Sequence, residues 1–194
     1  MSRQAWLQAL MLAGLLLLLQ AGGDETQAAL RFSRQALEQG AWWRLFTAHF
    51  IHLGWAHTVL NIAGVLLCCA LAPQLFNPYI WPRMACLAFG VGISLWCWTP
   101  EVTNYVGFSG VLYGLFFLGL WPEVRRGDRL AAFALAMTVG WMLWQWVIGP
   151  WTMEERWIGG RIASMAHLYG FSMGVAMSGA NRVWRSITFL KGNI

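Results

Sequence analysis

The residues of this chain best suited to chemistry are one serine and four histidines, all in long uncharged stretches. Ser109 lies in the sequence VGFSGVLYGL. The histidines are His49, His52, His57 and His167. A serine hydroxyl becomes a nucleophile when an adjacent histidine takes its proton. A lone histidine on an apolar helix face is more often structural, but four histidines in such segments favour a functional site.

His57 and Asn61 are spaced i, i+4 and therefore share one face of a helix. Both side chains can donate hydrogen bonds. Two convergent donors can line a pocket where negative charge develops. Histidine and asparagine also hold helices together within a membrane, and this segment alone leaves both interpretations open.

His167, Gly170 and Gly174 lie roughly on one face of a second helix. The two glycines form a small-xxx-small pair, which lets another helix approach closely. A helix packed on this pair would lie beside the imidazole of His167.

Gly110 and Gly114 form a matching pair directly after Ser109. Packing of the two pairs would bring the Ser109 hydroxyl within reach of His167. Gly107 and Gly110 allow a tight entry into the helix and a close approach of a substrate backbone. A helix that begins near Ser109 would direct its free N–H groups at an oxyanion.

The GxSG sequence is a weak signal alone, because its α/β-hydrolase form needs a strand, a turn and a helix. Nothing here predicts such a sheet. The combination of GxSG, a His/Asn helix and a histidine followed by GxxxG is far more specific.

The composition indicates that a lipid bilayer surrounds the elements that position these residues. The chain has 194 residues, of which 58% are hydrophobic and 11% charged, with 14 tryptophans. Soluble domains are about 25% charged. The net charge of +5 is spread over short loops, which favours a role in membrane orientation over nucleic-acid binding.

The intervals between charged residues predict an all-α polytopic membrane protein with six transmembrane helices in a single domain, 1–194. The expected spans are 4–22, 54–72, 83–99, 108–122, 130–149 and 162–180. The first segment also has the features of a secretory signal peptide, but five further spans favour a retained helix.

Loop charges predict that both termini are cytoplasmic. With that orientation the inner loops carry eight basic residues and the outer loops five. The inner ones are Arg3, Arg83, Arg125, Arg126, Arg129, Arg182, Arg185 and Lys191. The ends near Gly54, Gly107 and Arg161 then face outward.

Two further features concern the loops and the cysteines. The segment QAALRFSRQALEQGAWW suggests a short amphipathic helix anchored at the interface by Trp42 and Trp43. The cysteines have no CxxC spacing and are interpreted as small buried hydrophobic residues, neither disulfides nor metal ligands. They are Cys68, Cys69, Cys86 and Cys97.

From Trp43 to Gly174 these residues resemble the rhomboid family of intramembrane serine proteases. Trp43 and Arg44 resemble its WR motif. His52, His57 and Asn61 resemble its H-x4-H-x3-N motif. GFSG with Tyr113, and AHLYGFSMG, resemble its GxSG-x3-Y and AHxxGxxxG segments.

The resemblance implies a six-helix rhomboid-like bundle and a role for each matching residue. Ser109 would be the nucleophile and His167 the base, with no acidic third member. Tyr113 would stack on His167, and His57, Asn61 and the Ser109 N–H would form the oxyanion hole. His52 and Arg44 would be structural supports, Gly107, Gly110, Gly170 and Gly174 would allow close packing, and His49 has no assigned role.

The chain also resembles the bacterial rhombosortase branch, although Tyr113 follows the general rhomboid pattern. This implies cleavage near a Gly-Gly in transmembrane or C-terminally anchored proteins, with release of exported proteins. The expected location is the bacterial inner membrane, with the site open to the periplasm. No metal or organic cofactor is expected, and no nucleic-acid partner.

Two other functions compete with proteolysis. One is a membrane haem or metal protein that uses His52, His57 and His167, although HxxxxH is not the usual i, i+4 ligand pair. The other is a non-catalytic rhomboid-like protein that binds clients. The presence of both Ser109 and His167 argues against the second.

Overall fold

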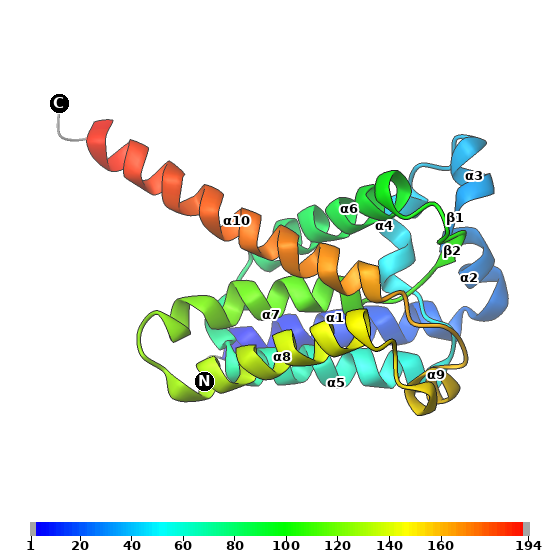
Figure 1. Cartoon of the computed structure of the whole chain (residues 1–194), viewed down its shortest axis with the longest axis horizontal. Coiled ribbons are helices and arrows are strands. Elements are labelled where there is room, and N and C mark those ends of the chain that lie inside the picture. Colours follow the sequence, from blue (N-terminus) through cyan, green and yellow to red (C-terminus); the bar gives the residue numbers. More distant parts are fainter. Residues whose placement is uncertain (1–2, 192–194) are drawn as a thin grey trace.

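A computed structural model describes the backbone of residues 3–191 and the side chains of residues 3–180, and it forms an elongated helical bundle (Figure 1). Arg182, Arg185 and Lys191, which the charge pattern assigns to the inner loops, lie outside the described side chains. The helices are α1 (Arg3–Ala21), α2 (Gly23–Leu30), α3 (Arg34–Glu38), α4 (Arg44–Thr47), η1 (Ala48–Phe50), α5 (Trp55–Leu71), η2 (Pro73–Leu75), α6 (Ile80–Trp98), α7 (Ser109–Val124), α8 (Arg129–Val147), α9 (Thr152–Ile158) and α10 (Ser164–Lys191).

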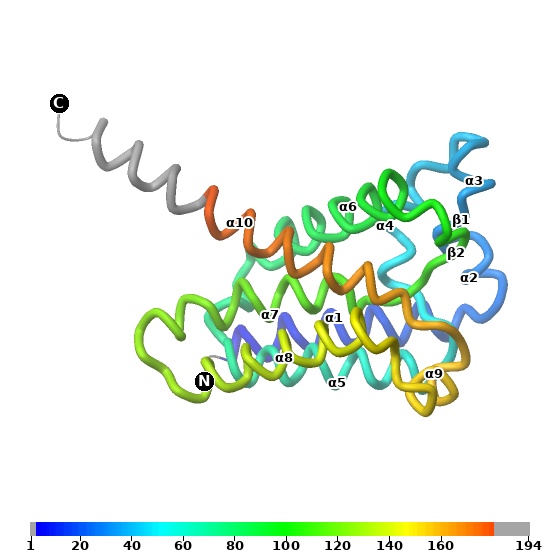
Figure 2. The backbone as a smooth tube through the Cα atoms, viewed as in Figure 1, coloured from blue at the N-terminus to red at the C-terminus, as the bar shows by residue number. Residues whose placement is uncertain are grey.

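Helix α7 is the central element, because it packs against α5, α6, α8 and α10. Its 16 residues span about 24 Å at 1.5 Å per residue. That length is less than the ~30 Å hydrocarbon core of a bilayer. The chain returns from the end of the molecule into the bundle before α7 begins (Figure 2). Helix α7, and with it Ser109 as its first residue, therefore begins inside the bundle and not at its end.

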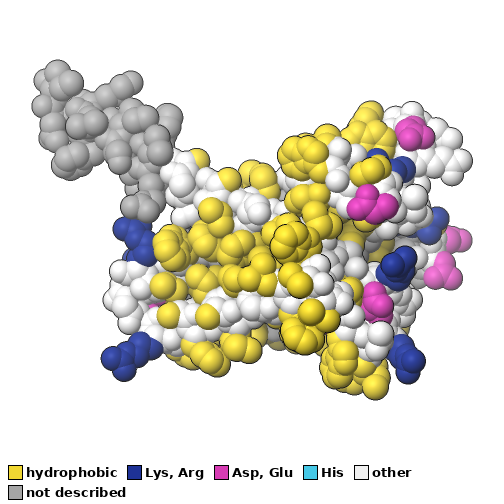
Figure 3. All heavy atoms as spheres, viewed as in Figure 1, with side chains coloured by type: hydrophobic (Ala, Val, Ile, Leu, Met, Phe, Trp, Pro, Cys, Tyr) yellow, Lys and Arg dark blue, Asp and Glu magenta, His cyan; other side chains and the backbone are white. Residues whose placement is uncertain are grey.

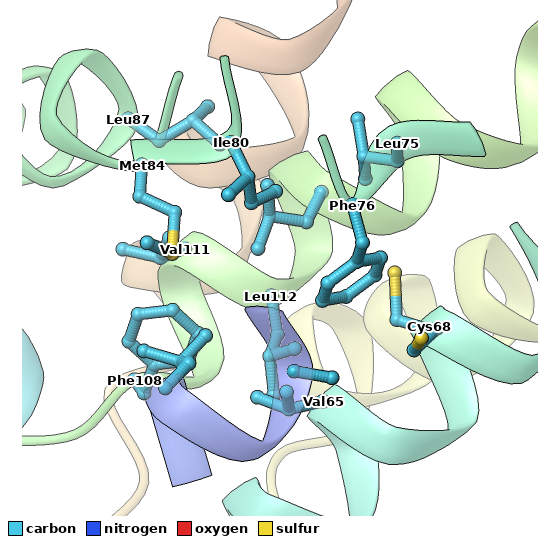
Figure 4. Packing of buried hydrophobic residues seen from close by; sticks show 14 of the residues in the cluster. Val65, Cys68, Leu75, Phe76, Ile80, Met84, Leu87, Phe108, Val111 and Leu112 are labelled. Carbon is cyan, nitrogen blue, oxygen red and sulfur yellow. The ribbon is translucent and has the colours of Figure 1, made fainter. Parts of the chain in front are cut away.

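The main hydrophobic core joins α1, α5, α6 and α7. Val65 and Cys68 of α5 belong to this cluster with Phe108, Val111 and Leu112 from the start of α7, and Figure 4 shows Val65 beside Leu112. Leu75, Phe76, Ile80, Met84 and Leu87 continue this packing between η2 and α6. Hydrophobic packing thus holds one side of α7. Another side of the same helix contacts α10.

The surface pattern is that of a membrane protein. Hydrophobic side chains cover the middle of the bundle, whereas charged ones gather toward its two ends (Figure 3). Within the described residues, α1, α6 and α8 are long and apolar enough to cross a bilayer. The segments Arg44–Phe50 and Trp55–Leu71 form a fourth candidate, bent by 88°. Six spans were predicted, so among the described residues length and composition support up to four of them. The other two predicted segments, 108–122 and 162–180, fall on α7 and α10.

The connection between the first two predicted spans is more structured than expected. In place of one amphipathic helix, α2 and α3 flank strand β1 (Phe32–Ser33), which pairs antiparallel with β2 (Asn104–Tyr105). Phe32 is opposite Tyr105, and both are buried. This short ribbon ties the connection to the segment that leads into α7.

The expectation that all four cysteines are buried is wrong for two of them. Cys68 and Cys69 are buried, whereas Cys86 and Cys97 on α6 are exposed. An apolar residue suits the lipid-facing side of a membrane helix as well as its core. Hydrophobicity therefore did not distinguish the two environments.

Arg34 links the segment between α1 and α5 to the C-terminal end of α6. Its guanidinium donates hydrogen bonds to the carbonyl oxygens of Leu95, Trp96, Thr99 and Val102 at 2.7–3.1 Å. It also lies 5.1 Å from the centroid of the Trp96 ring. The last carbonyls of a helix have no partner within that helix. One planar side chain with five donors therefore satisfies several of them together.

We expect Arg34→Ala to lower the free energy of unfolding by roughly 2–4 kcal/mol, because hydrogen bonds to charged groups contribute about 1.5–3 kcal/mol each and are not additive. Arg34→Lys should restore only part of this, since an ammonium lacks the planar fork. Denaturation in detergent micelles measures the change. Arg31→Ala, which removes an exposed arginine of the same connection, is the control. Equal stability of the Arg34 and Arg31 variants would contradict the interpretation.

Candidate active site

Ser109 and His167 come together at the interface between α7 and α10. Ser109 Oγ lies 2.8 Å from His167 Nε2, which is a normal hydrogen-bond distance. His167 is 5% exposed, and Ser109 is half-buried. The residues are 58 positions apart in the sequence, so tertiary packing of the two helices brings them together.

The glycine pairs explain how the two helices approach so closely. A Cβ atom on Gly170 would overlap the carbonyl oxygen of Gly110, and one on Gly174 would lie 2.7 Å from the carbonyl oxygen of Gly114. A Cβ on Gly110 would lie 2.9 Å from the carbonyl oxygen of Ala166. The backbones are therefore in contact, with no room for a side chain between them.

The imidazole of His167 is fixed on two further sides. The ring of Tyr113, one turn after Ser109, stacks on it with centroids 4.4 Å apart and planes at 22°. His167 Nδ1 lies 2.7 Å from Oε1 of Gln145 on α8. Stacking restrains the plane of the ring, and the hydrogen bond restrains its rotation within that plane.

The turn before Ser109 requires glycine at position 107. Gly107 has φ +124°, a conformation that residues with a Cβ rarely adopt. A Cβ there would also lie 2.9 Å from His57 Nε2. Glycine thus allows both the turn and the contact with the imidazole of His57.

His57 and Asn61 line the same cavity as the serine and the histidine. The cavity has a volume of about 640 Å³. Leu53 N donates to His57 Nδ1 at 3.4 Å, which assigns the proton of a neutral ring to Nε2. Asn61 Nδ2 donates to the carbonyl oxygen of His57 at 2.9 Å. An amide nitrogen has two hydrogens, so a second donor is left for a bound group.

His52, Arg44 and His49 are not among the residues that line this cavity. His52 Nε2 accepts a hydrogen bond from Phe108 N at 3.4 Å, and its ring packs edge-on against His57. Arg44 donates to the carbonyl oxygens of Ala28 and Arg31. His49 is fully buried and packs edge-on against Tyr105. His52 thus restrains the backbone just before α7, Arg44 restrains the end of α2, and His49 packs against β2.

Sequence reasoning missed Gln145 and Glu154. Gln145 is 2% exposed and donates from Nε2 to Glu154 Oε2 of α9 at 3.3 Å. Burial raises the pKa of the Glu154 carboxyl, while its hydrogen bond from Gln145 acts in the opposite direction. A signal existed, because Gln145 is an amide within a predicted span, and polar residues there are usually functional.

No group of three or more histidine, cysteine, aspartate or glutamate residues in the described part of the chain is arranged to hold a metal ion. Of the three histidines considered as ligands, His52 and His57 pack edge-on with ring centroids 4.9 Å apart. His167 instead directs its two nitrogens at Ser109 and Gln145.

Comparison with known proteins relates this chain to one family and to one bacterial protein. A family model described as "Rhomboid domain" matches residues 39–182. A protein of Bacillus subtilis (strain 168) named "Putative rhomboid protease YdcA" is 27% identical over 143 residues, which cover 72% of this chain and 67% of that protein. The family match contains Ser109, His167, His57 and Asn61. Of the other residues that line the cavity, Gln27 and Arg31 lie before the matched segment.

Proposed function

The chain belongs to the rhomboid family, and from that membership we propose that it is an intramembrane serine endopeptidase with Ser109 as nucleophile and His167 as base. The observation that carries the proposal is the 2.8 Å contact between Ser109 Oγ and His167 Nε2. Both residues line a cavity large enough to admit a peptide segment. The function named for the relative in Bacillus subtilis points the same way.

The proposed reaction passes through an acyl-enzyme. His167 Nε2 takes the hydroxyl proton as Ser109 Oγ forms a bond to the carbonyl carbon of the substrate. When the C–N bond breaks, the imidazolium returns that proton to the leaving amine. Water then attacks the ester with His167 again as base, which releases the new carboxyl end and restores the serine.

His57 Nε2–H, the second Asn61 Nδ2 hydrogen and the Ser109 N–H are the proposed oxyanion donors. Ser109 begins α7, and the first N–H groups of a helix have no partner within it. Each donor of this kind contributes about 3 kcal/mol to stabilisation of the transition state. The donors keep their positions before the reaction, because Leu53 N and the His57 carbonyl oxygen already engage His57 and Asn61.

The proposed substrates are proteins anchored by a transmembrane segment, which must unwind locally to expose a carbonyl. The chemistry needs water but no metal or organic cofactor. We place the protein in the bacterial inner membrane, with both termini cytoplasmic and the cavity open to the periplasm. The cavity is lined by the charged residues Arg31, Glu154 and Arg161, which supports an opening toward water on that side.

We further propose the rhombosortase activity, which is removal of C-terminal anchors next to a Gly-Gly. Purified protein in liposomes should cleave a reporter with a Gly-Gly, a hydrophobic helix and a basic tail. Replacing Gly-Gly by Leu-Leu should slow cleavage by about 30-fold, because each of the two glycines weakens a helix by close to 1 kcal/mol relative to leucine. Mass spectrometry of the released fragment locates the bond.

A reporter with the Gly-Gly moved to the opposite end of the same helix is the matched control. Equal cleavage of the Gly-Gly and Leu-Leu reporters would refute the preference while leaving the protease in place. Failure to cleave any anchored reporter, with folded protein, would refute the protease itself.

A further inference from the structure

Gln145 connects the proposed base to a carboxylate on a different element. It lies on α8, is 2% exposed, and uses both ends of its amide. Oε1 is 2.7 Å from His167 Nδ1, and Nε2 is 3.3 Å from Glu154 Oε2 on α9. The resulting chain of hydrogen bonds runs from Glu154 through Gln145 and His167 to Ser109.

The donors and acceptors of these groups allow only one arrangement of the hydrogen bonds. An ionised carboxylate only accepts hydrogen bonds, so the Gln145 NH₂ group must face Glu154. The amide oxygen then faces His167, and it also only accepts. His167 Nδ1 must therefore carry the proton. A neutral imidazole with Nδ1–H has a bare Nε2, and this is the nitrogen next to the Ser109 hydroxyl.

We propose that Gln145 is a positioning residue that holds His167 in the Nδ1–H form, and that Glu154 sets the orientation of the Gln145 amide. This inference rests on the proposed protease function. Without Glu154 the amide can flip and present its NH₂ group to His167. The proton would then move to Nε2, and His167 could no longer accept one from Ser109. Helix α9 thereby contributes to the reactivity of a base that it does not contact.

A purely structural role is the alternative. A buried histidine N–H without a partner costs about 1–3 kcal/mol, so any acceptor near Nδ1 would stabilise the fold. The two roles differ in what changes on substitution. A structural partner changes the stability, whereas a positioning partner changes the tautomer of His167 and the rate of the chemical step.

The first test is kinetic and uses a carboxyl–amide exchange. Gln145→Ala should lower kcat about 10- to 100-fold, as loss of a partner that orients a histidine does at metal sites. KM should change little. Glu154→Gln should lower kcat about tenfold by the same reasoning. The double variant Gln145→Glu with Glu154→Gln should recover at least half of the wild-type kcat, because the carboxylate can again accept from His167 Nδ1 and from the new amide.

Glu155→Gln is the matched control, since Glu155 lies beside Glu154 on α9 but accepts a hydrogen bond from Ile162 N. It should leave kcat within about twofold of the wild type, because glutamine keeps an oxygen that can accept from Ile162 N and this contact lies outside the hydrogen-bond chain to Ser109. A Gln145→Ala enzyme with wild-type kcat, or a double variant no better than Gln145→Ala, would overturn the proposal.

The second test determines the tautomer of His167 by NMR and needs no measurement of activity. In ¹⁵N-histidine-labelled protein, the His167 signals are identified by their loss in His167→Ala. The wild type should show a protonated Nδ1 and a bare Nε2, and Gln145→Ala should show a mixture. A wild-type His167 protonated at Nε2 would refute the inference. An inactive wild type with the expected tautomer would instead refute the proposed protease function.

Discussion

Ser109→Ala should abolish labelling by a fluorophosphonate probe and slow hydrolysis of an anchored reporter by about a million-fold, the loss seen when a serine protease loses its nucleophile. The hydroxyl is the proposed attacking group, and its hydrogen bond to His167 Nε2 at 2.8 Å is the route by which its proton leaves. No other atom of the side chain replaces it. In-gel fluorescence and the rate of reporter cleavage in liposomes measure the two effects.

His167→Ala should cause a loss of similar size, because a nucleophile and its base act as one unit and their effects are not additive. The denaturation midpoint of Ser109→Ala should stay near that of the wild type, because the half-buried hydroxyl lines a cavity. That of His167→Ala should fall, because the buried imidazole stacks on Tyr113 and is the partner of Gln145 Oε1.

Ser94→Ala is the matched control for the serine. Ser94 is also a buried serine on a membrane helix, but its hydroxyl donates to the carbonyl oxygen of Gly90 at 2.7 Å on the same helix. This variant should label and cleave like the wild type. Equal labelling of the Ser109 variant and the wild type would refute Ser109 as nucleophile. Folded wild-type protein without labelling or cleavage would favour the client-binding alternative.

The contact between Ser109 and His167 was within reach of sequence reasoning for a physical reason. Glycine has no side chain, so two GxxxG pairs on apolar helices predict that two backbones touch. Gly110 and Gly170 do so. Because Ser109 and His167 lie within a turn of these glycines, their approach followed from the backbone contact, and no knowledge of the remaining bundle was required.

Gln145 was not predictable in the same way, because α8 is apolar around most of its circumference. Its residues carry no periodic pattern that fixes which face turns inward. The partner of Gln145 also lies on α9, beyond a turn whose geometry the sequence does not specify. Arg34 was missed for a related reason, since its partners are backbone carbonyls, which every residue has.

The same physics limits the prediction of burial. In water an apolar helix face marks the core, but in a bilayer lipid-facing and core-facing positions are equally apolar. Cys68 and Cys86 therefore look alike in sequence, and one is buried while the other is exposed. The length of an uncharged segment has a similar limit. It predicted a span at 108–122, but it could not show that α7 is shorter than the bilayer core and begins inside the bundle.

Gly170→Ala should lower kcat/KM by about 100-fold or more, because a 1 Å misplacement of catalytic groups costs about that factor. The added methyl would overlap the carbonyl oxygen of Gly110, which is backbone and cannot rotate away. Helices α7 and α10 must therefore separate. Ser109 precedes Gly110 by one residue and His167 precedes Gly170 by three, so the separation acts directly on their hydrogen bond. Reporter cleavage in liposomes measures the effect.

The glycines of α10 provide a graded series that separates this effect from a general loss of stability. Gly174→Ala brings its methyl 2.7 Å from the Gly114 carbonyl oxygen, one turn farther from the dyad, and should lose less activity. Gly179→Ala has no atom within 4 Å of the new methyl and should keep full activity, with a helix stabilised by up to about 1 kcal/mol. Overpacking at Gly170 should also lower the free energy of unfolding by about 1–3 kcal/mol. If Gly170→Ala and Gly179→Ala were equally active, close approach of the two backbones would not be what brings the serine to the histidine.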